Sequence, residues 1–175
     1  MKQKLITFLF CITLIHVHSQ NKLPKLSLKT TEGENFDIQK LGKNNLTILS
    51  FWATWWGPCV KELDAINDVY ENWKEKVKVE VFAVSVDDSK TSSRVNSLVN
   101  GKEWEFKVLL DPNHDLKRSL NVNTVPHLFI IKKGKIIYQH TGYTPGIEDE
   151  LFEKLKELSK WTLLKKYILC MYFFL

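Results

Sequence analysis

The sequence predicts an α/β domain with a mixed central sheet flanked by helices. Residues 46–52 form a continuous apolar run of strand length, which suits a central strand covered on both faces. The segment that follows repeats its apolar residues at helical spacing. Near the other end, the Lys-Lys-Gly-Lys sequence at 132–135 separates two apolar runs, which is a hairpin signal. Alternating strands and helices that end in a hairpin predict both parallel and antiparallel pairs.

The first half of the domain follows directly from apolar periodicity. A helix is expected after the first strand, where apolar residues recur three and four apart: Val60, Leu63, Ile66, Val69, Tyr70 and Trp73. Residues 77–86 begin as an alternation and end as an apolar run, so they predict a second strand. Asp87-Asp88-Ser89 is typical of a loop with a helix cap. A short helix should then contain Val95, Leu98 and Val99.

Apolar runs and chain-breaking residues also predict the elements of the second half of the domain. A third strand is expected over 106–110, ended by Asp111-Pro112, with a short helix over 114–120. The hairpin strands should cover 128–131 and 136–138. A final amphipathic helix is indicated by Ile147, Leu151, Leu155 and Leu158.

Both ends of the chain differ from its middle. Residues 1–19 predict a secretory signal peptide, because Lys2 and Lys4 precede the apolar stretch 5–17 and Ser19 supplies a small residue at the expected cleavage point. That stretch is shorter than the ~20 residues of a membrane span, so cleavage and export to a bacterial periplasm or cell envelope are favoured over an uncleaved anchor. Residues 20–160 are the predicted domain, and 161–175 an apolar tail. The tail is compatible with packing on the domain, contact with a membrane surface, or disorder.

Charge and cysteine content restrict the partners, disulfides and cofactors that are expected. The net charge is +5, but the four terminal lysines account for most of the excess, and 21 basic face 20 acidic residues elsewhere. No clustered basic face is predicted, so nucleic acid is not an expected partner. Of the three cysteines, Cys11, Cys59 and Cys170, signal-peptide cleavage removes the first. A Cys59–Cys170 bridge is arithmetically possible but disfavoured by the unpatterned tail. We expect no metal site and no cofactor, since ligand spacing and phosphate loops are missing.

Residues 51–59, Phe-Trp-Ala-Thr-Trp-Trp-Gly-Pro-Cys, and the Val125-Pro126 pair before a later strand form a specific combination. The block resembles the active site of the thioredoxin superfamily, whose usual form ends in Trp-Cys-Gly-Pro-Cys, and Pro126 stands where that family places its cis-proline. Residues 22–158 look like the TlpA/ResA branch of envelope thiol–disulfide oxidoreductases. Two further features support this branch: the signal peptide and the helix-containing segment between the first strands and Pro126. The resemblance implies a thioredoxin-like fold and disulfide chemistry on exported polypeptides or a redox partner protein.

This sequence departs from the family pattern at the nucleophile. Trp56 occupies the position of the first cysteine, whose thiolate attacks the substrate disulfide. Only the resolving partner, Cys59, is present, and one thiol does not cycle between dithiol and disulfide within one site. Ser50 stands where the family often has a buried Asp. Glu62 matches a Glu that the ResA-like branch links to thiol chemistry; a first-turn glutamate favoured by the helix dipole is the alternative. Asp64 replaces a helix-kinking Pro.

The candidate site residues follow from these matches. The resemblance assigns Cys59 and Glu62 as catalytic candidates, Cys59 being either a reactive thiolate at a helix start or an inert core residue. For the groove it assigns Trp55, Trp56, Val125 and Pro126, where an extended peptide would add a strand-like contact. Trp56 is interpreted either as an aromatic anchor or as a plug for the vacated site.

Three functional hypotheses result. The first is a redox-degenerate member that binds polypeptides or a partner protein through the groove. The second is a monothiol oxidoreductase acting through Cys59. The third is an ordinary oxidoreductase with a recent loss or a sequence error at Trp56, since one base separates its codon from those of cysteine. A peroxidase is disfavoured, because Trp52 and Trp56 stand where a peroxiredoxin-like Pro-x-x-x-Thr-x-x-Cys motif has Pro and Thr.

Overall fold

The computed structural model describes the backbone of residues 22–173 and the side chains of residues 22–160. The predicted signal peptide with Cys11, and the side chain of Cys170, lie outside these described residues. The elements, in chain order, are β1 (Ser27–Thr30), β2 (Asn35–Asp37), the 3-10 helix η1 (Ile38–Lys40), β3 (Leu46–Trp52), α2 (Gly57–Val77), β4 (Val79–Ser85), α3 (Ser93–Lys102), β5 (Lys107–Leu110), α4 (Asp115–Ser119), β6 (His127–Lys132), β7 (Lys135–Thr141) and α5 (Ile147–Phe173).

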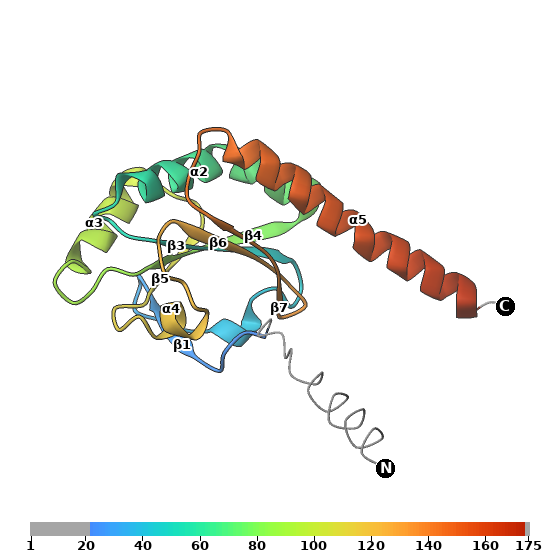
Figure 1. Cartoon of the computed structure of the whole chain (residues 1–175), viewed down its shortest axis with the longest axis horizontal. Coiled ribbons are helices and arrows are strands. Elements are labelled where there is room, and N and C mark those ends of the chain that lie inside the picture. The colour runs from blue at the N-terminus through green and yellow to red at the C-terminus, as the bar shows by residue number, and fades with distance from the viewer. Residues whose placement is uncertain (1–21, 174–175) are drawn as a thin grey trace, which may run out of the picture.

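One mixed sheet of seven strands forms the centre, in the order β2-β1-β5-β4-β3-β6-β7. The parallel strands β3, β4 and β5 lie side by side, and β6 and β7 add an antiparallel hairpin next to β3. The predicted α/β fold with a mixed sheet is therefore confirmed. Figure 1 shows α2, α3 and α5 on one face of the sheet and η1 and α4 on the other.

All seven residues of β3 are buried, because the strand is central and both of its faces are covered. Alternate residues of β3 contribute to two separate apolar clusters. Ile48 and Trp52 belong to the cluster under α2 and α5. Leu49 and Phe51 belong to the cluster on the side of η1 and α4. Packing on both faces therefore fixes the orientation of β3 and the position of the residues that follow Trp52.

The structure adds elements that the sequence analysis did not predict. β1 and β2 form an antiparallel hairpin, and β1 also pairs with β5. These strands have four and three residues, which is too short for an alternation to stand out. The cap predicted at Asp87-Asp88-Ser89 is also displaced. Asp88 accepts hydrogen bonds from the backbone of Lys90 and Thr91 in a turn, and α3 begins only at Ser93.

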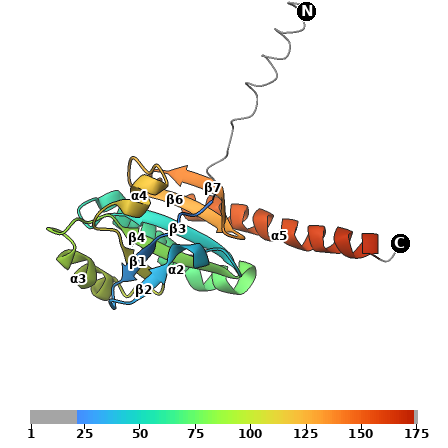
Figure 2. The ribbon, with the colours of Figure 1, turned by 90° about the horizontal axis from the view of Figure 1, so that it is seen from below.

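Helix α5 continues past the boundary predicted at residue 160 and ends at Phe173. Its last turns extend beyond the sheet in both ribbon views (Figures 1 and 2). Residues 161–173 therefore continue the helix of the domain in their backbone. Within the described part of the chain, no helix is both long and apolar enough to cross a membrane.

Candidate functional site

The site forms where β3 ends and α2 begins. After Trp52 the chain turns, with the backbone N–H of Trp56 donating to the carbonyl of Ala53 at 3.2 Å, and α2 starts at Gly57. Pro58 lies in the first helical turn, where its fixed φ and missing N–H are tolerated. Trp56 is the N-cap residue, and its side chain makes no capping hydrogen bond. The aromatic side chain is therefore free of any capping role in α2.

Two tryptophans are exposed at this turn. Trp55 has 57% and Trp56 has 46% of its surface accessible, and the one other exposed large apolar side chain among the described residues, Ile137, has 39%. Trp52, by contrast, is fully buried and packs edge-on against Trp104, with ring centroids 5.1 Å apart. An indole that is almost half exposed does not fill an interior position. The structure thus places Trp56 on the surface beside Trp55.

Cys59 lies directly beneath this surface and is fully buried. Burial raises the pKa of its thiol to about 12, and the carboxylates of Glu62 and Asp87 raise it further. A hydrogen bond involving the Ala53 backbone acts in the opposite direction but does not compensate. At neutral pH the side chain is a neutral thiol, which is a poor nucleophile. It forms no disulfide with any described residue.

Glu62 is also buried, with 1% of its surface exposed, and it is held by Ser50. The Ser50 hydroxyl donates to Glu62 Oε1 at 2.7 Å. Burial raises the pKa of the Glu62 carboxyl to about 7, although the Ser50 hydrogen bond lowers it. A glutamate that served only the helix dipole would lie at the surface of the first turn. Glu62 instead reaches the interior from α2 and meets the middle of β3.

The cis-proline loop approaches the same end of β3. The Val125–Pro126 peptide is cis, and His127 pairs with Phe51 across the β3–β6 ladder. The Pro126 carbonyl accepts a hydrogen bond from the N–H of Gly142 at 2.9 Å. Within residues 22–160, no backbone hydrogen bond engages Val125. Its N–H and C=O are therefore unpaired within this part of the chain.

Sequence reasoning missed a polar clamp that holds the turn before Trp55. The backbone N–H of Thr54 donates to Asp87 Oδ2 at 2.9 Å, and its hydroxyl donates to Asp87 Oδ1 at 2.5 Å. Ser85 also donates its hydroxyl to Asp87, at 2.8 Å. The strand register explains this clamp, because Trp52 pairs with Ser85 in the parallel ladder. Thr54 and Asp87 are each two residues further on, where parallel strands end together.

His127 lies beside this site without being one of its predicted residues. Its Nδ1 is 2.8 Å from the Thr141 hydroxyl, and its Nε2 is buried without a hydrogen-bond partner. Burial, and secondarily the charge of His140, lower the pKa of the imidazole. The neutral ring therefore predominates near pH 7. Across the side chains that the structure describes, no group of three His, Cys, Asp or Glu residues is arranged to hold a metal ion.

Comparison with known proteins gives the family of this site. A sequence profile described as the AhpC/TSA family matches residues 19–140, which is more than half of the chain. The chain belongs to the AhpC/TSA family. The thiol-disulfide oxidoreductase ResA of Bacillus thuringiensis subsp. konkukian is 30% identical over 137 residues, covering 78% of this chain and 76% of its own. The sporulation thiol-disulfide oxidoreductase A of Bacillus subtilis is 30% identical over 132 residues, covering 74% and 77%.

Solved structures of the same fold agree with this assignment to the AhpC/TSA family. The solution structure of an uncharacterized thioredoxin-like protein from Porphyromonas gingivalis has a TM-score of 0.70 and 45% identity, covering 79% of this chain and 92% of its own. StoA from Bacillus subtilis has a TM-score of 0.61 and 26% identity, covering 74% and 98%. The resemblance to ResA-like thiol–disulfide oxidoreductases and the thioredoxin-like fold are thereby confirmed.

Proposed function

We propose that this member of the AhpC/TSA family is an exported polypeptide-binding protein that has lost dithiol turnover. The observation that carries the proposal is Trp56 at the helix start where the family pattern has its nucleophilic cysteine, with 46% of its surface exposed. The remaining thiol, that of Cys59, is buried and has its pKa raised to about 12. Thiol–disulfide exchange requires an attacking thiolate, and neither residue supplies one at neutral pH. Export rests on the composition of residues 1–19.

The features beside the lost nucleophile favour binding of an extended polypeptide. Trp55 and Trp56 offer large apolar surfaces, and buried aromatic side chains are the usual energetic anchors of protein interfaces. The free backbone groups of Val125, next to Pro126, suit a strand-like contact. The aromatic side chains would supply affinity and the backbone contact would fix the direction of the bound chain.

Two measurements test the proposal. Reduction of insulin disulfides by the purified protein should not exceed the uncatalysed rate, and turnover comparable to that of ResA would contradict the loss of dithiol chemistry. Binding is measured by calorimetry with reduced, carboxymethylated α-lactalbumin, an unfolded polypeptide without free thiols. Trp56→Ala should weaken binding by about 2 kcal/mol, roughly 30-fold.

The controls separate binding from thiol chemistry. Ile137→Ala removes the other exposed large apolar side chain and should leave affinity unchanged. Cys59→Ser should also have little effect on binding to the thiol-free probe. If natural partners are retained by Trp56→Ala but lost with Cys59→Ser, the contact is covalent, and a monothiol oxidoreductase replaces the proposal.

A further inference from the structure

Four lysines line a cavity at the end of the sheet opposite Trp55 and Trp56. The cavity has a volume of about 200 Å³ and is lined in part by Lys43, Lys78, Lys132 and Lys133. Its wall also includes Ser159 of α5. The strand register explains the gathering, because Leu46, at the start of β3, pairs with Val79. The end of α2, the start of β3 and the β6–β7 turn therefore meet here.

The positive charge of this cavity is not neutralised by an ion pair among the residues whose side chains the structure describes. None of the four lysines forms an ion pair with a residue of the described part of the chain. The Lys132 ammonium donates to the carbonyl of Leu158, and its pKa is lowered by burial and then by the charge of Lys133. Glu80 is a carboxylate close to the cavity, and it accepts a hydrogen bond from Asn45 at 3.4 Å.

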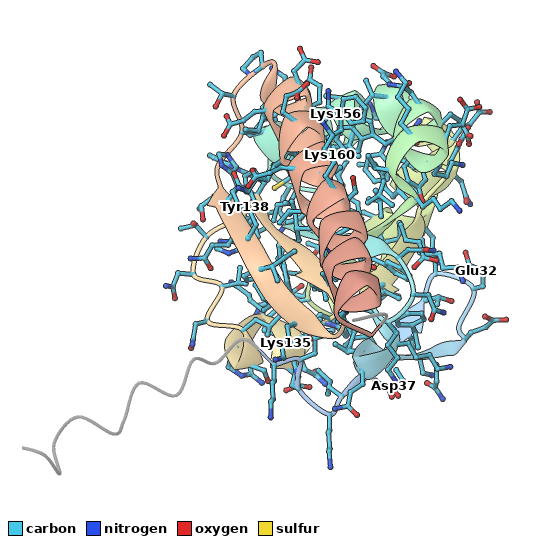
Figure 3. The ribbon with its side chains drawn as sticks, turned by 90° about the vertical axis from the view of Figure 1, so that its right-hand side faces the viewer. Glu32, Asp37, Lys135, Tyr138, Lys156 and Lys160 are labelled. Atoms are coloured by element: carbon cyan, nitrogen blue, oxygen red, sulfur yellow. The ribbon has the colours of Figure 1, made fainter. Side chains whose placement is uncertain are left out.

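Further lysines lie on the same side of the molecule. Figure 3 looks onto this side and shows Lys135 at the start of β7 and Lys156 and Lys160 on α5. Lys156 is in an ion pair with Glu153, whereas Lys160 is exposed and not in an ion pair with a described residue. Lys22 pairs with Lys135 through an isolated antiparallel bridge. Several basic residues thus lie on the side from which α5 leaves the domain, where Figure 3 also labels the acidic Glu32 and Asp37.

The segment that leaves the domain here is strongly apolar. Ten of the thirteen residues from 161 to 173 are apolar, and two of the other three are Lys165 and Lys166. Their backbone continues α5 and extends beyond the sheet (Figures 1 and 2). At 1.5 Å per residue this extension is about 20 Å long. Trp161 and Tyr167 are residue types enriched where a membrane meets water.

We propose that this end of the molecule docks on an anionic bilayer surface, with residues 161–173 lying in the interface and the lysine-lined cavity facing the lipid headgroups. Helices that carry lysines on a polar face and aromatic and leucine residues on the other lie in the plane of a membrane interface, and residues 161–173 contain residues of both kinds. Lysines near an anionic membrane add attraction that falls off within a Debye length. A second copy of the chain fits less well, because a two-fold contact would bring the same lysines face to face.

The docking fixes an orientation for the polypeptide-binding face. β3 runs from the lysine-lined cavity at Leu46 to the start of the site at Trp52, a distance of about 20 Å for a strand of this length. Trp55 and Trp56 would therefore face away from the bilayer and meet polypeptides in the aqueous compartment. The proposal does not depend on what those tryptophans bind.

A fluorescent label on Cys170 tests the proposal in the full chain. An environment-sensitive maleimide dye is attached to Cys170 in a Cys11→Ser background, where buried Cys59 is protected. Vesicles of phosphatidylcholine mixed with phosphatidylglycerol should shift the emission to shorter wavelength, and phosphatidylcholine alone should not. Combining Lys43→Gln, Lys78→Gln and Lys133→Gln should reduce the apparent affinity on the order of 100-fold, since each lysine contributes about fivefold.

The control combines Lys29→Gln, Lys90→Gln and Lys107→Gln, three exposed lysines outside this cavity, and has the same net charge. It should retain the affinity of the parent protein. Equal losses in both triple variants, or equal binding to both vesicle types, would overturn the proposal. An emission shift without vesicles, accompanied by a doubled mass in light scattering, would overturn it in favour of a second copy. Near-ultraviolet circular dichroism verifies that each variant is folded.

Discussion

Ser50 in β3 and Glu62 in α2 are joined by a buried hydrogen bond of 2.7 Å from the serine hydroxyl to the glutamate carboxyl. Because both side chains are inside, this contact links the central strand to the helix that carries the site. Ser50 stands where many relatives of this fold are expected to have a carboxylate. Here the strand supplies a hydroxyl donor to the carboxyl of the helix.

This pair makes the stability of the protein depend on pH. Burial raises the pKa of Glu62 from 4.5 to about 7, so the folded state binds a proton that the unfolded state releases in this range. The contribution to stability is fully present below pH 4.5 and declines as the pH rises toward 7. Urea unfolding at about pH 5 and about pH 8 should show a loss on the order of 3 kcal/mol from this group. Glu62→Gln should flatten the difference, and an unchanged slope would contradict the assignment.

Cys59 should resist alkylation in the native protein. The thiol is buried and its pKa is raised to about 12, so the thiolate fraction near pH 7 is minute. Labelling followed by peptide mass spectrometry should show Cys59 reacting more slowly than Cys170, and urea should abolish the difference. Rapid modification of Cys59 below pH 7 would indicate an activated thiolate and support a monothiol enzyme.

Trp56→Cys should restore measurable disulfide reductase activity. The substitution places a thiol at the N-cap of α2, where the helix dipole favours a thiolate, three residues before Cys59. We expect turnover in the insulin assay, at a rate below that of ResA because Ser50 provides no carboxylate. The matched control adds Cys59→Ser to the same chain. It should lose turnover, and activity that survived this change would refute the dithiol explanation.

Asp87 should act as a positioning residue for the two exposed tryptophans. Asp87→Asn retains the shape of the side chain but weakens its hydrogen bonds with Thr54 and Ser85, at a cost of about 1–3 kcal/mol in unfolding free energy. Affinity for carboxymethylated α-lactalbumin should fall as well, because the turn before Trp55 loses its clamp. A double-mutant cycle with Thr54→Val measures the coupling through the Thr54 hydroxyl, and additive effects on binding would show that this hydroxyl does not mediate it.

The sequence was most informative where periodicity and burial coincide. The run from Leu46 to Trp52 predicted a fully buried strand, and the strand has those bounds. β1 and β2 were missed because strands of four and three residues carry too little pattern. α5 was expected to end near Leu158, where the amphipathic pattern stops, yet the backbone remains helical to Phe173. Helical backbone requires only local hydrogen bonds, so a helix can continue beyond the residues whose amphipathic pattern packs them against the sheet.

For the site too, the local features were predictable from the sequence, whereas the contacts between separate elements were not. The local sequence from Phe51 to Cys59 predicted a strand, a turn and a helix start, and the structure has them in that order. The Ser50–Glu62 bond was not predicted, because it joins two elements whose relative placement depends on packing. The clamp between Thr54 and Asp87 depends on the register of β3 with β4, which apolar runs alone do not specify.

The pairing of β3 with β6 has a consequence for how the protein becomes active during its synthesis. Trp56 and Pro126 are 70 residues apart in the chain, and they are brought to one end of the sheet by the register that joins Phe51 to His127. A nascent chain that ends before β6 contains both tryptophans but has no adjoining proline loop. The polypeptide binding that we propose would therefore begin only after most of the domain has emerged and β6 has entered the sheet. Until then the growing chain lacks the completed surface with which to capture polypeptides, its own unfolded segments included.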